Sequence, residues 1–295
     1  MFHFAYHEPN SLAGIISLLA DHGENAALLA GGTDLLVDLR HGKLHPAHVV
    51  SLWGAPELQG MTEEDGGSMR VGALSTAAEL GDRFAARPAW QCLSEASLLL
   101  GSRQIQNVAT VGGNICKASP AADLVTALLC LDARVLLSGP QGGREVPLEG
   151  FLTGPGRTSM KAAEVLTGIR LPAPPRGAAT AFMKIMRRKA EDLSTAAVSA
   201  HVSIGGKGRT VESCRIALGA VGPCPFRARS AEAILLGQVL SPALLCTAAA
   251  AARSEARPID DIRGSADYRR EMIEVLVSRA LAAAADRAWE GAGQS

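Results

Sequence analysis

Two pairs of adjacent glycines are the residues of this sequence best suited to hold an anionic ligand. The first pair lies in Leu29-Ala30-Gly31-Gly32-Thr33-Asp34, where an apolar run predicts a strand that leads through the glycines into a helix. Glycine tolerates positive φ and lets a phosphate approach backbone N–H groups closely. A single pair of this kind is usually an ordinary tight turn, so alone it is weak evidence for a phosphate site.

The second pair repeats this arrangement. In Thr110-Val111-Gly112-Gly113-Asn114 a hydroxyl residue and an apolar residue precede two glycines and a polar side chain. Two facing loops of backbone donors suit a pyrophosphate, which carries two negative charges and many acceptor oxygens. Neither loop matches G-x-G-x-x-G or G-x-x-x-x-G-K-[ST], so a Rossmann or P-loop site is not supported. We therefore predict a dinucleotide cofactor held by its pyrophosphate at a site of another kind.

An acidic residue follows the second glycine pair. Ser119 and Pro120 predict the start of a helix that runs to about Leu131, with Ser119 as the cap and Pro120 in the first position. Asp123 in its first turn either complements the helix dipole or accepts hydrogen bonds from a ribose. The spacing alone leaves these two interpretations equal.

No metal site and no catalytic side chain is predicted in this chain. His41, His45 and His48 are spaced by four and three residues, but Pro46 interrupts any helix there and no acidic ligand matches, which favours a solvated loop. Lys184 and the run 187–189 are basic residues typical of a surface. HExxH, GxSxG and a nucleophile–base pair are all absent, so hydrolytic chemistry is not indicated. The cysteines have neither CxxC pairs nor zinc or cluster spacing and are predicted to be buried reduced thiols: Cys92, Cys116, Cys130, Cys214, Cys224 and Cys246.

Composition narrows the function classes further. The 295 residues contain 29 basic and 29 acidic side chains, which gives no electrostatic footprint for nucleic acid or an anionic membrane. The N-terminus lacks the features of a signal peptide, and no segment approaches 18 uninterrupted apolar residues. We expect a cytoplasmic protein with no nucleic-acid or membrane partner.

The elements that must position the glycine pairs form the first half of the chain. A helix over 12–19 is predicted, capped by Asn10 or Ser11 and ended by Gly23. Hairpins are expected around the tips 63–67 and 139–143 because glycine-rich polar segments separate short apolar runs. The other predicted elements are strands over 26–30, 49–52 and 164–171 and helices over 33–40, 75–82 and 88–99.

The proline-rich segment 171–177 is the clearest domain boundary, since its prolines can neither donate to a sheet nor continue a helix. We predict domains over 1–175, with subdomains of about 1–55 and 56–175, and over 176–295. The second domain is expected to contain three strands, with a turn at 205–208 between the last two, followed by helices. Their ranges are 179–187, 196–204 and 211–219 for the strands and 227–237, 241–255 and 267–288 for the helices. Both halves are α+β, because the strands arrive in hairpins rather than in strict βαβ alternation.

With these motifs in place, the sequence resembles the FAD-binding subunits of the molybdenum hydroxylases, most closely those of the bacterial xanthine dehydrogenase type. The resemblance lies in ordered stretches across most of the chain, which are 28–35, 104–116, 118–123, 150–156 and 187–193. It implies a vanillyl-alcohol-oxidase-type (PCMH-type) FAD domain of two α+β subdomains. It also implies a C-terminal domain with a three-stranded antiparallel sheet and a helix bundle.

The resemblance also implies a set of FAD-binding positions. Residues 28–35 and 110–114 would cradle the pyrophosphate, Asp123 would bind the ribose, and Leu193 would lie against the isoalloxazine ring, near Glu191 and Asp192 where nicotinamide arrives. Leu100 and Leu193 stand where relatives often have an aromatic residue. The full set is Leu28, Leu29, Ala30, Gly31, Gly32, Thr33, Asp34, Leu35, Leu100, Thr110, Val111, Gly112, Gly113, Asn114, Asp123, Leu166, Lys184 and Leu193.

An electron-transfer subunit is the function that this resemblance implies. Substrate would be oxidised at a molybdenum cofactor on one partner chain, and electrons would pass through [2Fe-2S] clusters of another partner to FAD here and then to NAD. A dimer of heterotrimers is the expected assembly. The chain lacks the inserted cluster-binding loop of the relatives that reduce hydroxybenzoyl-CoA. Two alternatives are a self-sufficient flavin oxidoreductase and a non-catalytic scaffold subunit, and the substrate itself is not encoded here.

Overall fold

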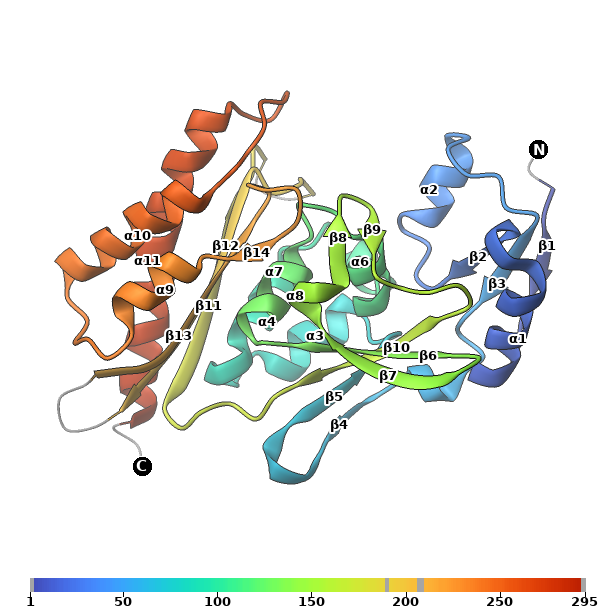
Figure 1. The fold of residues 1–295 in the computed structure, drawn as a ribbon, viewed down its shortest axis with the longest axis horizontal. Coiled ribbons are helices and arrows are strands. Elements are labelled where there is room, and N and C mark those ends of the chain that lie inside the picture. The colour runs from blue at the N-terminus through green and yellow to red at the C-terminus, as the bar shows by residue number, and fades with distance from the viewer. Residues whose placement is uncertain (1–2, 189–190, 206–209, 293–295) are drawn as a thin grey trace.

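The computed structural model describes residues 3–188, 191–205 and 210–292. Its sheets follow one another along the molecule: a small parallel sheet, a five-stranded antiparallel sheet, and a second antiparallel sheet beside the C-terminal helices (Figure 1). The molecule is therefore a mixed helix and strand structure, as predicted.

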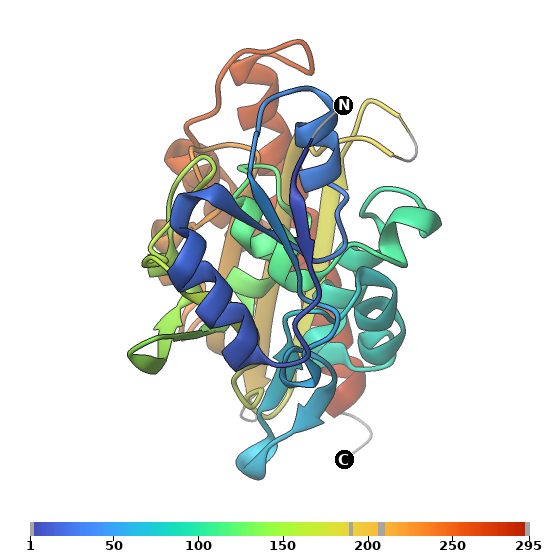
Figure 2. The ribbon, with the colours of Figure 1, turned by 90° about the vertical axis from the view of Figure 1, so that its right-hand side faces the viewer.

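The N-terminal sheet is parallel, with the strand order β1 (Ala5–His7), β3 (His48–Ser51), β2 (Ala26–Leu29). Between the strands lie α1 (Leu12–His22) and α2 (Leu35–Arg40), and the turned view in Figure 2 brings this unit to the front. Ser11 caps α1 by accepting a hydrogen bond from the Gly14 N–H at 3.2 Å, and Gly23 ends the helix with a φ of 55°. The expectation that strands arrive in hairpins was wrong here, because helices connect these strands.

The second sheet contains both predicted hairpins. Its strand order is β4 (Met61–Glu63), β5 (Met69–Gly72), β10 (Val165–Leu171), β6 (Arg134–Gly139), β7 (Gly142–Pro147). The first hairpin begins at Met61, directly after a 3-10 turn over Pro56–Leu58 and two further residues. A small hairpin, β8 (Leu152–Gly154) and β9 (Arg157–Thr158), lies outside this sheet.

Six helices accompany the second sheet in the described chain: α3 (Ala77–Phe84), α4 (Gln91–Leu98), α5 (Arg103–Gln106), α6 (Val111–Lys117), α7 (Asp123–Cys130) and α8 (Leu148–Phe151). Two expectations about this region were wrong. Gly112 and Gly113 lie in the first turn of α6 rather than in a loop. The helix expected from Ser119 begins only at Asp123, because Ser119 closes a turn by accepting the Ala122 N–H at 3.1 Å.

The C-terminal sheet has three long antiparallel strands, β11 (Ala178–Ile185), β12 (Ala196–Gly205) and β13 (Thr210–Gly219), and a two-residue fourth strand, β14 (Phe226–Arg227). The turn expected at 205–208 lies outside the described residues beyond Gly205. The helices that follow are α9 (Arg229–Leu235), α10 (Pro242–Glu255) and α11 (Ala266–Ala292). No helix in the described part of the chain is both long and apolar enough to span a membrane.

Strand β12 is covered on both faces. Val198, Ala200 and Val202 belong to the apolar core shared with α10 and α11, whereas Ala197, which points the opposite way, belongs to the core of the second sheet. Helices α4 and α7 contact the C-terminal sheet from that side. The two halves of the chain thus share a packed interface.

The cysteines are all free. The expectation of burial is confirmed for Cys92, Cys130 and Cys214, but Cys116 and Cys246 are exposed, and Cys224 is half-buried.

Candidate cofactor site

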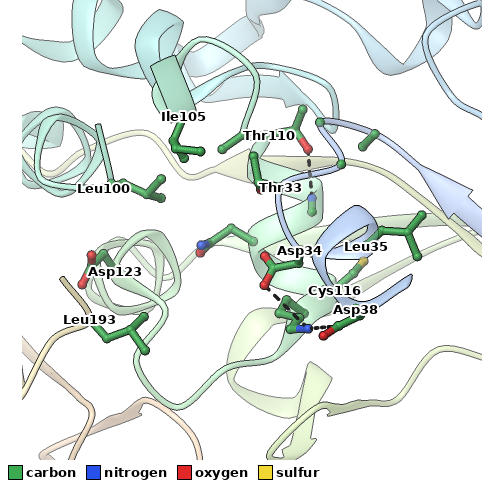
Figure 3. Close-up of a pocket in the computed structure, with 18 of the residues that line it drawn as sticks. Thr33, Asp34, Leu35, Asp38, Leu100, Ile105, Thr110, Cys116, Asp123 and Leu193 are labelled. Atoms are coloured by element: carbon green, nitrogen blue, oxygen red, sulfur yellow. Dashed lines mark hydrogen bonds and ion pairs between the residues drawn. The ribbon is translucent and has the colours of Figure 1, made fainter. Parts of the chain in front are cut away.

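A cavity of about 790 Å³ lies between the N-terminal sheet, α5, α6, α7 and the segment after β11, which is a size typical of a cofactor site. Figure 3 shows Thr33, Asp34 and Leu35 on one side of it and Asp123 with Leu193 on another. The predicted site residues that line it are Leu28, Ala30, Gly31, Gly32, Thr33, Asp34, Leu35, Leu100, Thr110, Gly113, Asn114, Asp123 and Leu193. The two glycine segments and Asp123 therefore meet at one cavity.

The first glycine pair is held by a close backbone contact. A Cβ on Gly31 would lie 1.8 Å from the Val108 carbonyl oxygen, so no other residue fits without movement of the backbone. Gly32 has a φ of 72°, which glycine alone adopts readily. The close contact between Gly31 and Val108 holds the turn after β2 against the segment that leads into the second glycine pair.

The second glycine pair serves two different purposes. Gly112 packs against Ala73, the residue directly after β5, since a Cβ on Gly112 would lie 2.9 Å from both the Ala73 Cβ and the Ala73 carbonyl oxygen. Gly113 faces the cavity, and its N–H donates to Thr110 Oγ1 at 3.1 Å, which caps α6. Asn114 Oδ1 is buried and has no hydrogen-bond partner among the described residues. A buried acceptor in this state fits a ligand that supplies a donor.

Asp123 is the first residue of α7 and is held by two side chains. Its Oδ2 accepts a hydrogen bond from Lys184 Nζ at 2.6 Å and its Oδ1 accepts one from Ser194 Oγ at 2.5 Å. Burial raises the pKa of Asp123 above its usual value, against the opposing effects of Lys184 and Ser194. Each carboxylate oxygen keeps a further lone pair, so Asp123 can still accept a ribose hydroxyl.

A second charged cluster lies at the other side of the cavity. Lys117 Nζ contacts Asp38 Oδ2 at 2.6 Å and Asp34 Oδ1 at 3.6 Å (Figure 3). The hydrogen bond from Lys117 lowers the pKa of Asp38 below its usual value. Burial by itself would lower the pKa of Lys117, but Asp38 and Asp34 raise it overall. The lysine ammonium thus stays charged beside the first glycine pair.

Leucine and isoleucine side chains form the apolar part of the wall. Leu100 and Ile105 lie on one side and Leu193, 49% exposed, on another. Of the described residues that line the cavity, none is aromatic. Flat rings can pack here by apolar contact but without ring stacking.

Asp192, directly before Leu193, is paired with Arg187. Asp192 accepts the Arg187 backbone N–H at 3.2 Å and the Arg187 side chain at 3.3 Å, which lowers the pKa of Asp192. Glu191 lines the cavity with a φ of 55°, a conformation that L-residues seldom adopt. Lys189, part of the predicted basic run, lies outside the described residues.

Five predicted site residues do not line the cavity: Leu29, Val111, Gly112, Leu166 and Lys184. Lys184 lies behind Asp123 with its side chain only 1% exposed, and Leu166 in β10 is part of the core. Val111, Gly112 and Leu166 are buried in the packed interior, and Leu29 is half-buried at the end of β2, so these residues can support the wall.

Several lining residues were missed by the sequence analysis: Asp38, Leu44, Gly101, Ser102, Ile105, Ala109, Cys116, Lys117 and Ala121. Lys117 could have been found, because it is a basic residue only three positions after Asn114, the last residue of the second glycine motif. Asp38 could also have been found, because it lies four residues after Asp34 and residues four apart share one side of a helix.

Comparison with known proteins identifies the family. Residues 2–174 match the model of the FAD binding domain in molybdopterin dehydrogenase, and residues 181–284 match that of the CO dehydrogenase flavoprotein C-terminal domain. The chain belongs to the FAD-binding subunits of the molybdenum hydroxylases. FAD is accordingly the group that the fold implies for the cavity.

Individual relatives extend over nearly the whole chain. A putative xanthine dehydrogenase FAD-binding subunit of Escherichia coli is 35% identical over 96% of this chain and 98% of its own. The carbon monoxide dehydrogenase medium chain of Hydrogenophaga pseudoflava is 35% identical over 95% of this chain and 96% of its own. A solved structure of the carbon monoxide dehydrogenase from this organism superposes with a TM-score of 0.91, covering 97% of this chain and 98% of the other, at 35% identity. The resemblance and fold class predicted from sequence are thus confirmed.

Proposed function

We propose that the cavity holds FAD with its pyrophosphate between the Gly31-Gly32 turn and the start of α6. The observation that carries this proposal is that both glycine segments and Asp123 line one cavity. Asp123 would accept a ribose hydroxyl, and the buried Asn114 Oδ1 would gain the donor that it lacks. Lys117 would offset phosphate charge beside Asp34 and Asp38.

The redox-active ring of FAD would then lie near Leu193. Bound flavin supplies the electron-transfer chemistry, while the protein binds it, orients it and limits its contact with water. Glu191 and Asp192 line the cavity beside Leu193, and Leu193 itself is half exposed, which leaves room for an electron acceptor to approach. No side chain need act as a nucleophile in this role.

The chain would work as one subunit of a larger enzyme. Electrons would arrive from [2Fe-2S] clusters on one partner and ultimately from a molybdenum cofactor on another, and would leave to NAD. A dimer of heterotrimers and a cytoplasmic location complete the proposal. The substrate depends on the partner: relatives are named as dehydrogenases of xanthine, carbon monoxide, glyceraldehyde and nicotinate.

Separate measurements test FAD binding, NAD as the electron acceptor, and the partner subunits. Purified chain should bind about one FAD, seen as flavin absorbance after gel filtration, and NADH should then reduce an artificial dye. Co-purification should recover a molybdenum subunit and a [2Fe-2S] subunit. If the chain shows no flavin absorbance after incubation with excess FAD and gel filtration, the FAD site is overturned and the scaffold alternative is favoured. FAD binding without any NADH oxidation would overturn NAD as the acceptor. Substrate oxidation by the chain alone would favour a self-sufficient oxidoreductase.

A further inference from the structure

Three histidines far apart in sequence meet on the N-terminal sheet. His7 ends β1, His22 ends α1 and His48 begins β3. Their ligand-capable atoms all lie within 4.8 Å of one another, and each side chain is half-buried. His48 therefore clusters with His7 and His22, not with its sequence neighbours His41 and His45, for which the sequence favoured a solvated loop and no metal site.

The sheet register explains how two of these side chains meet. Ala5 of β1 is the register partner of His48, and His7 lies two residues further along the same strand. Residues two apart point to one face of a strand, so His7 and His48 share a face. The end of α1 brings His22 to the same place, where its ring stacks on that of His48 with centroids 3.6 Å apart.

The distances are close to those of a metal site with imidazole ligands. His7 Nε2 and His48 Nδ1 are 3.0 Å apart, so they share a hydrogen bond. In a tetrahedral zinc site with Zn–N bonds near 2.0–2.1 Å, ligand atoms are separated by about 3.4 Å. The planes of the His22 and His48 rings are only 10° apart, and an imidazole lone pair lies in the plane of its ring, so the His22 side chain would have to turn out of this stack to coordinate a shared ion. A metal ion would replace the proton shared by His7 and His48, because metal-bound imidazoles must be unprotonated at the ligand atom.

We propose that His7, His22 and His48 form a binding site for a divalent transition-metal ion, with Zn²⁺ as the best match. Three imidazoles and one open position suit zinc, whereas Mg²⁺ and Ca²⁺ require oxygen ligands. Half-burial leaves a path for the ion and for a water as the fourth ligand.

The site would have a structural role, separate from the cofactor cavity. His48 is paired with Ala26 at the amino end of β2, whereas Gly31 follows the carboxyl end of that strand. A bound ion would join β1, α1 and β3, and β1 has only three residues to hold it to the sheet. Binding to the folded state alone would therefore stabilise the N-terminal unit.

The test uses full-length chain treated with EDTA and with its thiols alkylated, because the exposed Cys116 and Cys246 could also bind zinc. Titration with Zn²⁺ should show about one tight site, and the melting temperature should rise by several degrees in excess Zn²⁺. His22→Ala and His48→Ala should weaken binding at least tenfold and remove the rise. His41→Ala, at an exposed histidine just after α2, is the matched control and should behave as wild type.

Equal zinc binding by wild type and both site variants would overturn the proposal, as would no binding by wild type. Circular dichroism checks that each variant folds. If an alanine variant does not fold, His22→Asn or His48→Asn takes its place, since asparagine keeps a polar side chain. Co²⁺ gives an independent readout. The visible absorption bands of a nitrogen-ligated ion should appear with wild type and His41→Ala, and they should be absent from the variants at His22 and His48.

Discussion

Asp123 joins the two halves of the molecule through a single carboxylate. Its partners Lys184 and Ser194 both come from beyond residue 176, and the Lys184 ammonium is almost wholly enclosed. A buried charge that loses its partner destabilises a protein strongly, by about 3–5 kcal/mol. The loss of stability and the loss of a cofactor contact at Asp123 must therefore be measured apart.

A double-mutant cycle separates them. We expect Asp123→Asn to lower the free energy of unfolding by several kcal/mol, because the buried Lys184 loses its carboxylate partner. Asp123→Asn with Lys184→Met should recover most of that stability, since no unpaired charge remains. FAD affinity should stay about tenfold weaker in both, because the ribose hydroxyl would donate to a neutral amide oxygen in place of a charged carboxylate, whose hydrogen bonds are worth about 1.5 kcal/mol. Denaturant unfolding and FAD titration measure the two quantities, and full recovery of FAD affinity in the double variant would contradict a ribose contact.

His201 predicts a pH dependence of stability. Burial, with Arg215 and Arg227 nearby, lowers its pKa from 6.5 to about 3. Below pH 6.5 the unfolded chain gains a proton at His201 that the folded chain does not. The contribution of the neutral, buried His201 to the stability of the folded state is therefore complete above pH 6.5 and is lost as the pH falls toward 3. The expected slope is at most about 1.4 kcal/mol per pH unit.

Comparison with His201→Asn checks this assignment. Urea unfolding at several values between pH 7 and pH 4.5 gives the free energy of unfolding as a function of pH. Its slope should be shallower for the variant than for wild type, by an amount that corresponds to the uptake of roughly one proton on unfolding. Parallel slopes for the two proteins would show that another group is responsible.

At the scale of elements, close backbone contacts decide where the two glycine segments lie. The turn after β2 packs on the carbonyl of Val108, and the first turn of α6 packs on Ala73, which directly follows β5. Neither contact tolerates a Cβ, so the glycines serve packing as well as access to a phosphate. The shape of the cavity therefore depends on residues that do not all line it.

Gly31→Ala should separate the turn from the segment before α6. Because its Cβ would overlap the Val108 oxygen, we expect a loss of about 2 kcal/mol or more of stability, as for overpacked sites, and at least tenfold weaker FAD binding. Gly150→Ala is the matched control, since a Cβ at Gly150 in α8 meets nothing within 4 Å. Melting temperatures and FAD titrations of the two variants measure the difference. Similar values for both would show that the turn can move freely.

The capping box of α3 offers a smaller, local effect. Thr76 Oγ1 accepts the Glu79 N–H at 3.3 Å, and the Glu79 carboxylate accepts the Thr76 N–H at 2.8 Å. Thr76→Ala should cost about 1 kcal/mol of stability. Urea unfolding measures it, and Thr76→Ser, which keeps the cap, should remain near wild type.

At the scale of the whole molecule, the predicted boundary at 171–177 divides the chain in sequence, but residues from both sides of it share one apolar core. Phe182, Ala197 and Ala217 lie in the same apolar cluster as residues of α4 and α7. Arg287 of α11 also reaches back to Glu95 Oε1 and to the Thr180 carbonyl, each at 2.5 Å. The FAD domain is therefore stabilised by residues that follow the linker.

A fragment of residues 1–175 tests this dependence. Without the C-terminal sheet, it would expose the apolar sides of α4 and α7 and lose both partners of Asp123. We expect it to aggregate or bind a hydrophobic dye strongly, and to hold no FAD, whereas full-length chain is monodisperse. Gel filtration and dye fluorescence measure these properties. A stable, FAD-binding fragment would show that the first domain folds independently.

The sequence by itself determined much of the local structure. Ser11 and Gly23 fixed the ends of α1, and the alternation of apolar residues and turns located the long strands of the C-terminal sheet, because caps and turns depend on neighbouring residues. The glycine motifs and Asp123 also marked positions at the cavity, as the resemblance implied.

Only the tertiary structure decided which distant residues meet. It placed Lys184 behind Asp123, gave Gly112 a packing role, and brought Lys117 to the cavity. It also gathered His7, His22 and His48, whose spacing in sequence follows no metal motif. Such contacts depend on sheet order and on the packing of one element against another, and neither is encoded in the local pattern of residues.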